Sequence, residues 1–164
     1  GGIIAASEGY EFLASELPDW LKTMHPYVAA RMNTGGESST FDYLTALRRV
    51  QRLWQRADAQ LAEVDVLATP TIPVTPPIIS EVEDPETYRN SNMLTLSNTM
   101  AGNSLNLCGI TIPVGLDKAG MPVGLQLLSR LHNEETLLAV ALAVEVVIGT
   151  PAERLGKPPL GGSL

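Results

Sequence analysis

The chain has 164 residues, the size of one ordinary domain, and 45% of them are hydrophobic while 18% are charged. This composition allows a buried core and excludes disorder over the whole length. Eleven basic against eighteen acidic residues give a formal net charge of -7, the wrong sign for a nucleic-acid-binding protein. The single cysteine, Cys108, excludes an internal disulfide and a zinc site built from thiolates. A reducing cytoplasm is therefore the expected compartment, and no apolar run approaches the roughly 20 residues of a membrane span.

The first residues of the chain predict two helices. Residues 3–21 have helical periodicity and predict one helix, which Pro18 ends or kinks. Residues 26–32 predict a second, shorter helix. The opening segment GGIIAASEGY has neither a start methionine nor the basic region of a signal peptide, so we expect it to differ from a natural N-terminus.

A long helix and a strand follow. Ser39, with Asp42 three residues later, matches a capping box and predicts a helix over residues 40–63. Residues 65–69 form a short apolar run that ends at Pro70, a pattern typical of a buried strand.

The second half of the chain predicts a hairpin and a further helix. Residues 80–92 are polar and predict a surface segment, whereas residues 93–107, rich in Ser, Thr and Asn, are ambiguous in type. Two apolar runs separated by LDKAGM predict a β-hairpin over residues 110–129. Residues 134–148 predict a helix that is apolar on almost every side and must be buried in a core or an interface. Residues 149–164, rich in Pro and Gly, predict an irregular tail.

No complete catalytic set is visible in these segments. His25 and His132 are isolated and predict no metal site, and no glycine-rich phosphate loop indicates a cofactor. Ser39 follows paired glycines as a nucleophilic serine can, but nothing near it in sequence serves as a base, so helix capping explains it better. Cys108 is more typical of a small buried residue than of a nucleophile. The sequence therefore indicates binding sites without catalysis.

Six segments occur in a recognisable order: GGIIAASEGY, HPYVAARMNTG, FDYLTALRRVQ, DVLATPTIPVTPP, LNLCGITIPVG and GMPVGLQLLSRLHNEETLLAVA. Their order and spacing resemble the C-terminal part of the amidase signature enzymes, a hydrolase family that cleaves the C–N bonds of amides. The specific part is the pair formed by DVLATPT and NLCGITIPVG…GMPVGLQLL. The resemblance is collinear over residues 3–150.

The resemblance implies an α/β fold with a mixed β-sheet flanked by helices, and a catalytic set of a serine, a cis-configured bridging serine and a lysine. In the family these residues lie upstream of the segments found here, so we expect the N-terminal catalytic part to be missing. Residues 1–150 would be the C-terminal portion of the amidase domain and residues 151–164 a tail. The expected partner is the N-terminal part of the same amidase. Without it, the exposed apolar faces predict aggregation or a homo-oligomer.

The resemblance also implies substrate-binding residues. Related amidases use an arginine at the place of Arg31 to hold polar or carboxylate-bearing substrates, although a surface ion pair would explain Arg31 equally well. The amidotransferase relatives carry an acidic residue near Asn92 for the substrate's amino group. The Asn92 side chain is an uncharged amide, which cannot offset the lost hydration of an ammonium group as a carboxylate does. It therefore argues against glutamine as substrate. Asn98, Thr99 and Asn103 either orient an amide substrate or satisfy backbone groups, and the second reading is more common.

The sequence therefore predicts the C-terminal segment of an amidase that acts on a small amide or ureide, with no cofactor and with its catalytic residues elsewhere. Two alternatives share the fold. One is the A subunit of the glutamine-dependent tRNA amidotransferase, which would bring partner subunits. The other is a non-catalytic assembly or binding module on the same scaffold.

Overall fold

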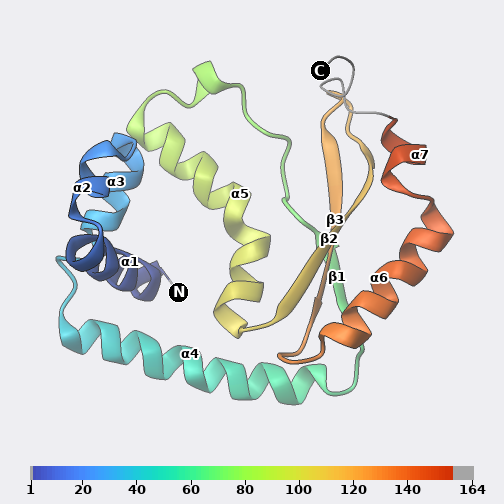
Figure 1. Ribbon diagram of the computed structural model, residues 1–164, viewed down its shortest axis with the longest axis horizontal. Helices are drawn as coiled ribbons and strands as arrows, with labels where there is room; N and C mark the ends of the chain where they lie inside the picture. The colour runs from blue at the N-terminus through green and yellow to red at the C-terminus, as the bar shows by residue number, and fades with distance from the viewer. Residues whose placement is uncertain (1, 157–164) are drawn as a thin grey trace. The chain divides into compact units, whose positions relative to one another are not determined.

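A computed structural model describes residues 2–156 and has the α/β composition expected from the sequence (Figure 1). Contacts between residues divide the chain into two compact units, Gly1–Arg56 and Ala57–Leu164. Residues 157–164, for which the sequence predicts an irregular tail, lie outside the described residues. Among the helices described between residues 2 and 156, none combines the length and the apolar composition that a membrane span requires.

The first unit is helical. Its elements are α1 (Gly2–Glu16), α2 (Pro18–Thr23), α3 (Pro26–Asn33) and the first part of α4 (Thr40–Leu61). The helix predicted over residues 3–21 ends before Pro18, one of the two effects predicted for this proline, so its continuation to residue 21 as one helix is wrong. Pro18 has no backbone N–H with which to continue α1, and it instead occupies the first position of α2. The predicted helix over residues 26–32 is confirmed as α3.

Small residues let α1 and α3 come together with the loop that precedes α4. Ala6 of α1 is buried, and a Cβ at Gly35 would lie 2.0 Å from the Ala6 carbonyl oxygen. Only glycine fits so close an approach of two backbones. At the start of α4 the Tyr43 hydroxyl donates a 2.8 Å hydrogen bond to the Glu8 carboxylate, and this bond raises the pKa of the Tyr43 phenol.

The start of α4 follows the predicted capping pattern. The Ser39 hydroxyl oxygen accepts a hydrogen bond from the Asp42 backbone N–H at 3.1 Å. The same hydroxyl donates to the Asp42 carboxylate at 2.5 Å. Ser39 is therefore a helix cap with both of its hydrogen-bonding functions in use, as the sequence predicts.

The second unit contains a three-stranded antiparallel sheet with the strand order β1-β3-β2. Its strands are β1 (Leu67–Pro70), β2 (Cys108–Leu116) and β3 (Pro122–Ser129). β2 and β3 are the predicted hairpin. The Asp117 carboxylate closes the turn by accepting hydrogen bonds from the Met121 N–H at 2.9 Å and the Thr75 hydroxyl at 2.8 Å, which lower its pKa.

β1 is an edge strand within the described sheet, and its expected burial is wrong. Leu67 is 45% exposed because β1 pairs only with β3 and has no described strand on its other side. A short 3-10 helix, η1 (Ile79–Glu81), lies in the polar connection that follows. The apolar run before Pro70 therefore identifies the strand but not its position in the sheet.

Helix α6 (Glu134–Ile148) packs on one face of the sheet. Leu127 and Ile112 from the strands meet Leu137 and Ala141 from the helix in one buried cluster. The opposite face of α6 is exposed in this chain, and its large apolar side chains are Leu138, Leu142, Val146 and Val147. Only one side of the predicted all-round apolar helix is therefore buried by the described residues. Its self-association stays a prediction.

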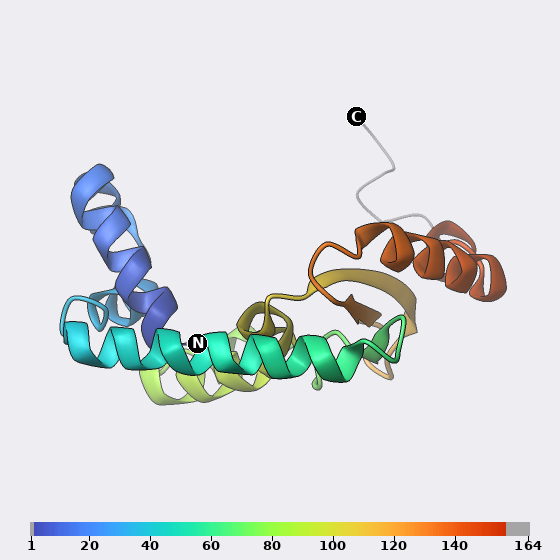
Figure 2. The same cartoon turned by 90° about the horizontal axis from the view of Figure 1, so that it is seen from below.

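Helix α5 (Pro85–Leu105) forms from the segment whose type the sequence left ambiguous. The Asp84 carboxylate caps its start by accepting from the Glu86 and Thr87 N–H groups at 3.1 and 3.0 Å. Asn106 ends it in the left-handed conformation, with φ of 56°. Figure 1 shows α5 on one side of the strands and α6 on the other, and Figure 2 shows the two helices from below.

The predicted irregular tail is wrong for its first residues, which form α7 (Pro151–Leu155). Thr150 and Glu153 make a reciprocal capping box at its start. Arg154 then donates hydrogen bonds to the Ile148 carbonyl at 2.6 Å and to the Val114 carbonyl of β2. Val114 lies at a register shift between Pro113 and Gly115. The Val114 carbonyl therefore accepts a hydrogen bond from outside the regular pairing of β2 with β3. This hydrogen bond from Arg154 holds α7 against the sheet.

Candidate ligand-binding site

A row of polar side chains crosses the face of the sheet opposite α6. Gln126 of β3 lies directly between Thr69 of β1 and Thr111 of β2 in the strand register. Residues that are opposite one another in neighbouring strands project to the same face. Leu127, one position further along β3, projects to the other face and joins the core under α6. Strand β3 therefore presents Leu127 to α6 and Gln126 to the opposite face.

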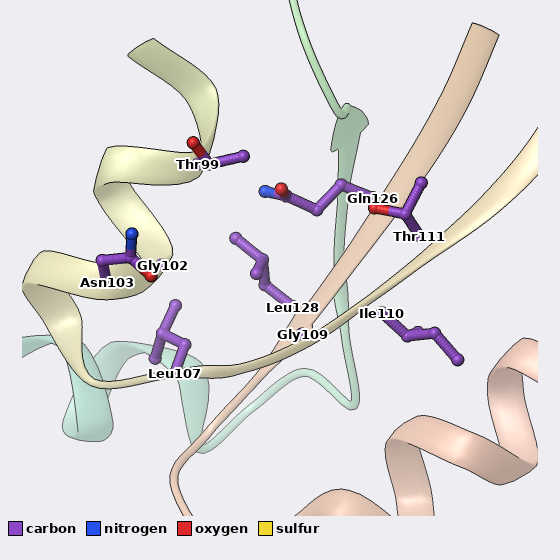
Figure 3. Close-up of a pocket in the computed structure, with 9 residues that line it drawn as sticks. All are labelled: Thr99, Gly102, Asn103, Leu107, Gly109, Ile110, Thr111, Gln126 and Leu128. Carbon is purple, nitrogen blue, oxygen red and sulfur yellow. The ribbon is translucent and has the colours of Figure 1, made fainter. Parts of the chain in front are cut away.

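A hollow of about 240 Å³ lies between this polar face and helix α5. Its walls come from α5, β2, β3 and the α5–β2 connection, and the lining residues are Thr99, Gly102, Asn103, Leu107, Gly109, Ile110, Thr111, Gln126 and Leu128. Figure 3 shows the Gln126 side-chain amide directed from β3 toward α5, into this space. All nine lining residues are uncharged, so the hollow offers hydrogen bonds and apolar contacts but no ion pair.

Glycines allow the two walls to approach each other. A Cβ at Gly102 of α5 would lie 3.1 Å from the Leu128 Cδ2 atom, and one at Gly109 would lie 2.9 Å from the same atom. Leu128 is thus enclosed from two sides, and it forms the apolar floor of the hollow. Larger residues at either glycine would push Leu128 toward the open space.

The loop after β1 is also fixed to this face. The Asn98 amide donates a 2.8 Å hydrogen bond to the Pro70 carbonyl, and the Thr71 N–H donates to the Gly124 carbonyl at 2.8 Å. The hydroxyl oxygens of Thr71 and Thr111 lie 3.2 Å apart in a hydrogen bond. Asn98 therefore satisfies a backbone carbonyl group, which is the more common of the two roles that the sequence analysis gives it.

Thr99 and Asn103 both line the hollow, as a substrate-binding role requires. The Thr99 hydroxyl donates a 3.1 Å hydrogen bond to the Leu96 carbonyl of its own helix. The Thr99 oxygen retains its capacity to accept a hydrogen bond. Of the three residues predicted as candidates for orienting a substrate, Thr99 and Asn103 therefore lie at the hollow, and Asn98 does not.

Arg31 and Asn92, the residues that the family resemblance implies for substrate binding, do not line the hollow. Arg31 is exposed on α3 in the first unit, and it makes no ion pair with the residues described. Asn92 is half-buried on α5 in the second unit, seven residues before Thr99. Since the two residues belong to different units, their roles stay predictions.

The cysteine and the first histidine of the chain have structural hydrogen bonds, and the described residues bring no metal ligands together. The Cys108 thiol is half-buried and donates to the Arg130 carbonyl at 3.1 Å, a contact typical of a structural cysteine. His25 caps α3 by accepting from the Tyr27 N–H at 3.3 Å. Within residues 2–156, no three His, Cys, Asp or Glu side chains come together as metal ligands.

Gln126, Thr111 and Leu128 are site residues that the sequence analysis missed. A signal for Gln126 was present, because it is the one polar residue in the apolar run Leu125–Leu128 of β3. Alternation along a strand places a lone polar residue on the face opposite its apolar neighbours. Thr111 interrupts the apolar run of β2 in the same way.

Comparison with known proteins identifies the family of this chain. The model of the Amidase family matches residues 11–138, and the chain belongs to this family, the amidase signature proteins. The chain is 37% identical over 159 residues to 2-amino-5-chloromuconic acid deaminase of Comamonas testosteroni, covering 97% of this chain and 34% of that protein. It therefore spans about a third of the length of this relative.

Two further likenesses agree with this membership. The chain is 43% identical over 98 residues to the A subunit of glutamyl-tRNA(Gln) amidotransferase from Halobacterium salinarum, covering 57% of this chain and 22% of that protein. In fold it is similar to 6-aminohexanoate cyclic dimer hydrolase complexed with substrate, with a TM-score of 0.73 and 19% identity. That match covers 95% of this chain and 36% of the hydrolase. The second likeness concerns the fold alone.

Proposed function

We propose that this chain is the C-terminal part of an amidase that hydrolyses the C–N bond of a small amide or ureide in the cytoplasm. The observation that carries the proposal is the family match over residues 11–138. The chain spans about a third of the length of its relative, which supports separate roles for two parts of a longer protein. This part supplies sheet, helices and binding groups, and a segment upstream supplies the catalytic set.

The proposed chemistry is acyl transfer through a serine, a cis-configured bridging serine and a lysine, all upstream of these residues. A neutral lysine accepts the proton of the nucleophilic serine through the bridging serine, and the serine oxygen attacks the amide carbonyl carbon. Backbone N–H groups stabilise the oxyanion. The amine leaves with a proton, and water then releases the acyl group as the carboxylic acid. Residues of this chain bind and orient the substrate.

Ammonia release from a panel of primary amides tests the proposal. The 164-residue chain alone is expected to be inactive, whereas the longer protein that contains it is expected to release ammonia and to react with a serine-directed fluorophosphonate. The label should map to a serine outside this chain. Hydrolysis by the isolated chain, or label on Ser38 or Ser39, would refute the proposal. A folded longer protein without hydrolysis would favour the non-catalytic binding module.

Arg31 is proposed to bind a polar group of the substrate. In the longer protein, Arg31→Ala should raise KM with little change in kcat, because a binding contact that is equal in ground state and transition state affects KM alone. Arg31→Lys keeps the charge but loses the planar fork and should recover only part of the affinity. Arg49→Ala, at an exposed arginine of α4, is the control. Unchanged KM in Arg31→Ala would assign Arg31 to the surface.

The similarity to the amidotransferase over 98 residues supports a second candidate function, as one component of a tRNA-dependent amidotransferase. The uncharged lining of the hollow is unfavourable for the ammonium group of glutamine, since no carboxylate there would replace its hydration. Glutaminase activity of the longer protein, increased by partner subunits and charged tRNA, would support the second candidate. Hydrolysis of simple amides without glutaminase activity would support the first.

A further inference from the structure

Gln126 carries a buried hydrogen-bond donor that has no acceptor. The residue is 5% exposed, and its Nε2 atom is buried and makes no hydrogen bond with the residues that the structure describes. Thr69 lies directly opposite Gln126 in the sheet. Its hydroxyl oxygen is also buried and makes no hydrogen bond with the described residues. Buried polar groups in folded proteins are almost always satisfied. An unsatisfied amide that faces a hollow therefore indicates a missing acceptor.

The surroundings of Gln126 restrict what that acceptor is. The hollow holds about 240 Å³, while a water molecule takes roughly 30 Å³ in the liquid, so a group of several heavy atoms fits. The lining contains no charged side chain. A carboxylate or an ammonium bound against these walls would give up part of its hydration without gaining an ion pair. An uncharged group with a strong acceptor oxygen loses much less.

We propose that the hollow is a subsite for an uncharged carbonyl compound, with the Gln126 Nε2 group donating to the carbonyl oxygen. Leu128 would contact the apolar part of the ligand, and the oxygen of Thr99 would be available to an N–H group on it. Gln126 is thus a specificity-determining residue that favours neutral amides over carboxylates and amines. The choice of an amide rests on the proposed function, whereas the binding itself does not require hydrolysis.

Side-chain amide signals in the NMR spectrum of the 164-residue chain, labelled with 15N, test this proposal. The chain contains four glutamines, and Gln51, Gln55 and Gln60 are exposed on α4. Propionamide should shift the Gln126 NH2 signals saturably and leave the other three unmoved. Propionate and propylammonium, which have similar shape but carry charge, should shift them far less. Shifts by propionate equal to those by propionamide would contradict a neutral subsite.

Two variants separate the hydrogen bond from general packing. Gln126→Leu removes the donor at similar volume and should weaken propionamide binding about tenfold, the effect of losing one buried hydrogen bond. Gln55→Leu should bind as the native chain does. Binding in the variants is followed by the backbone N–H signals of Gly102 and Gly109. If Gln126→Leu does not fold, the response of the Gln126 NH2 signals of the native chain to propionamide decides whether the subsite exists.

The outcomes distinguish this inference from the proposed function. No shift of the Gln126 signals at any soluble concentration of propionamide would overturn the subsite, and would leave Gln126 to ordered water or to another protein segment. That result would not touch amide hydrolysis by the longer protein. Conversely, saturable binding by a chain whose longer form hydrolyses no amide would retain the subsite and refute the amidase.

Discussion

Replacing Leu137 with alanine should destabilise the second unit strongly, whereas the same replacement at Leu142 should not. Both residues lie on α6, so the change in helix propensity is the same for the two variants. They differ in exposure, since Leu137 is 3% exposed against Leu127 and Ile112 and Leu142 is 62% exposed. The pair therefore tests which face of α6 is buried.

The expected magnitudes follow from this difference. Leu→Ala at a fully buried core site costs about 2.7–5 kcal/mol, the sum of lost transfer free energy and the cavity that remains. For Leu142 the cavity contribution is absent and most of the side chain is already in water, so the cost should stay under about 1 kcal/mol. Leu137→Met, which conserves volume, should cost less than about 1.5 kcal/mol.

Urea unfolding followed by far-ultraviolet circular dichroism measures these changes. The variants should move the transition midpoint while the dependence on urea, m, stays constant, because the surface exposed on unfolding is nearly the same. An equal or larger loss for Leu142→Ala would refute the assignment of the buried face. It would mean that the outer side of α6 is covered in solution, and sedimentation at several concentrations would then show whether a second copy covers it.

Two further predictions concern the polar face and the hairpin turn. Gly124→Ala should cost about 1–3 kcal/mol, because the new Cβ would lie 2.6 Å from the Thr71 hydroxyl oxygen; urea unfolding measures the loss, and an unchanged midpoint would contradict the close approach. Asp117→Asn should lower stability at neutral pH, since hydrogen bonds from Met121 and Thr75 hold the pKa of this carboxyl below its ordinary value of 3.8. A lowered folded-state pKa stabilises the fold above the unfolded pKa and stops doing so as pH falls through the folded value. The difference between the Asn variant and the native chain should therefore disappear in acid, and a difference that is constant with pH would refute the role of the charge.

Matched controls exist for both predictions. Gly2→Ala introduces a Cβ with no atom within 4 Å, and it should leave stability unchanged or slightly higher because alanine favours a helix. Asp58→Asn changes an exposed carboxylate of α4. Its effect on the free energy of unfolding should be small at every pH, as is usual for exposed charges.

Several local features could be predicted because their causes lie within a few residues of sequence. Ser39 and Asp42 meet across one helical turn, so the start of α4 depends on no distant contact. The turn around Asp117 joins two apolar runs that are neighbours in sequence, and the hairpin follows from it. The family could also be predicted, because motif order is a property of the sequence alone.

Helix α5 marks the limit of local signals. Its Ser, Thr and Asn residues compete with backbone groups and give no helical preference of their own. In the structure the hydroxyls of Ser97 and Thr99 donate to carbonyls of the preceding turn, while Gly102 packs on Leu128 of β3. Packing on the sheet, more than composition, accounts for this helix.

The helices with clear caps, the hairpin, the family and the list of polar residues available for binding all follow from local sequence patterns. The hollow beside Gln126, the single buried side of α6 and the contact of Arg154 with β2 emerge only when distant segments pack together. They depend on strand register. A strand presents residues alternately to its two faces, and which face meets α5 or α6 depends on pairing with strands that lie far away in sequence.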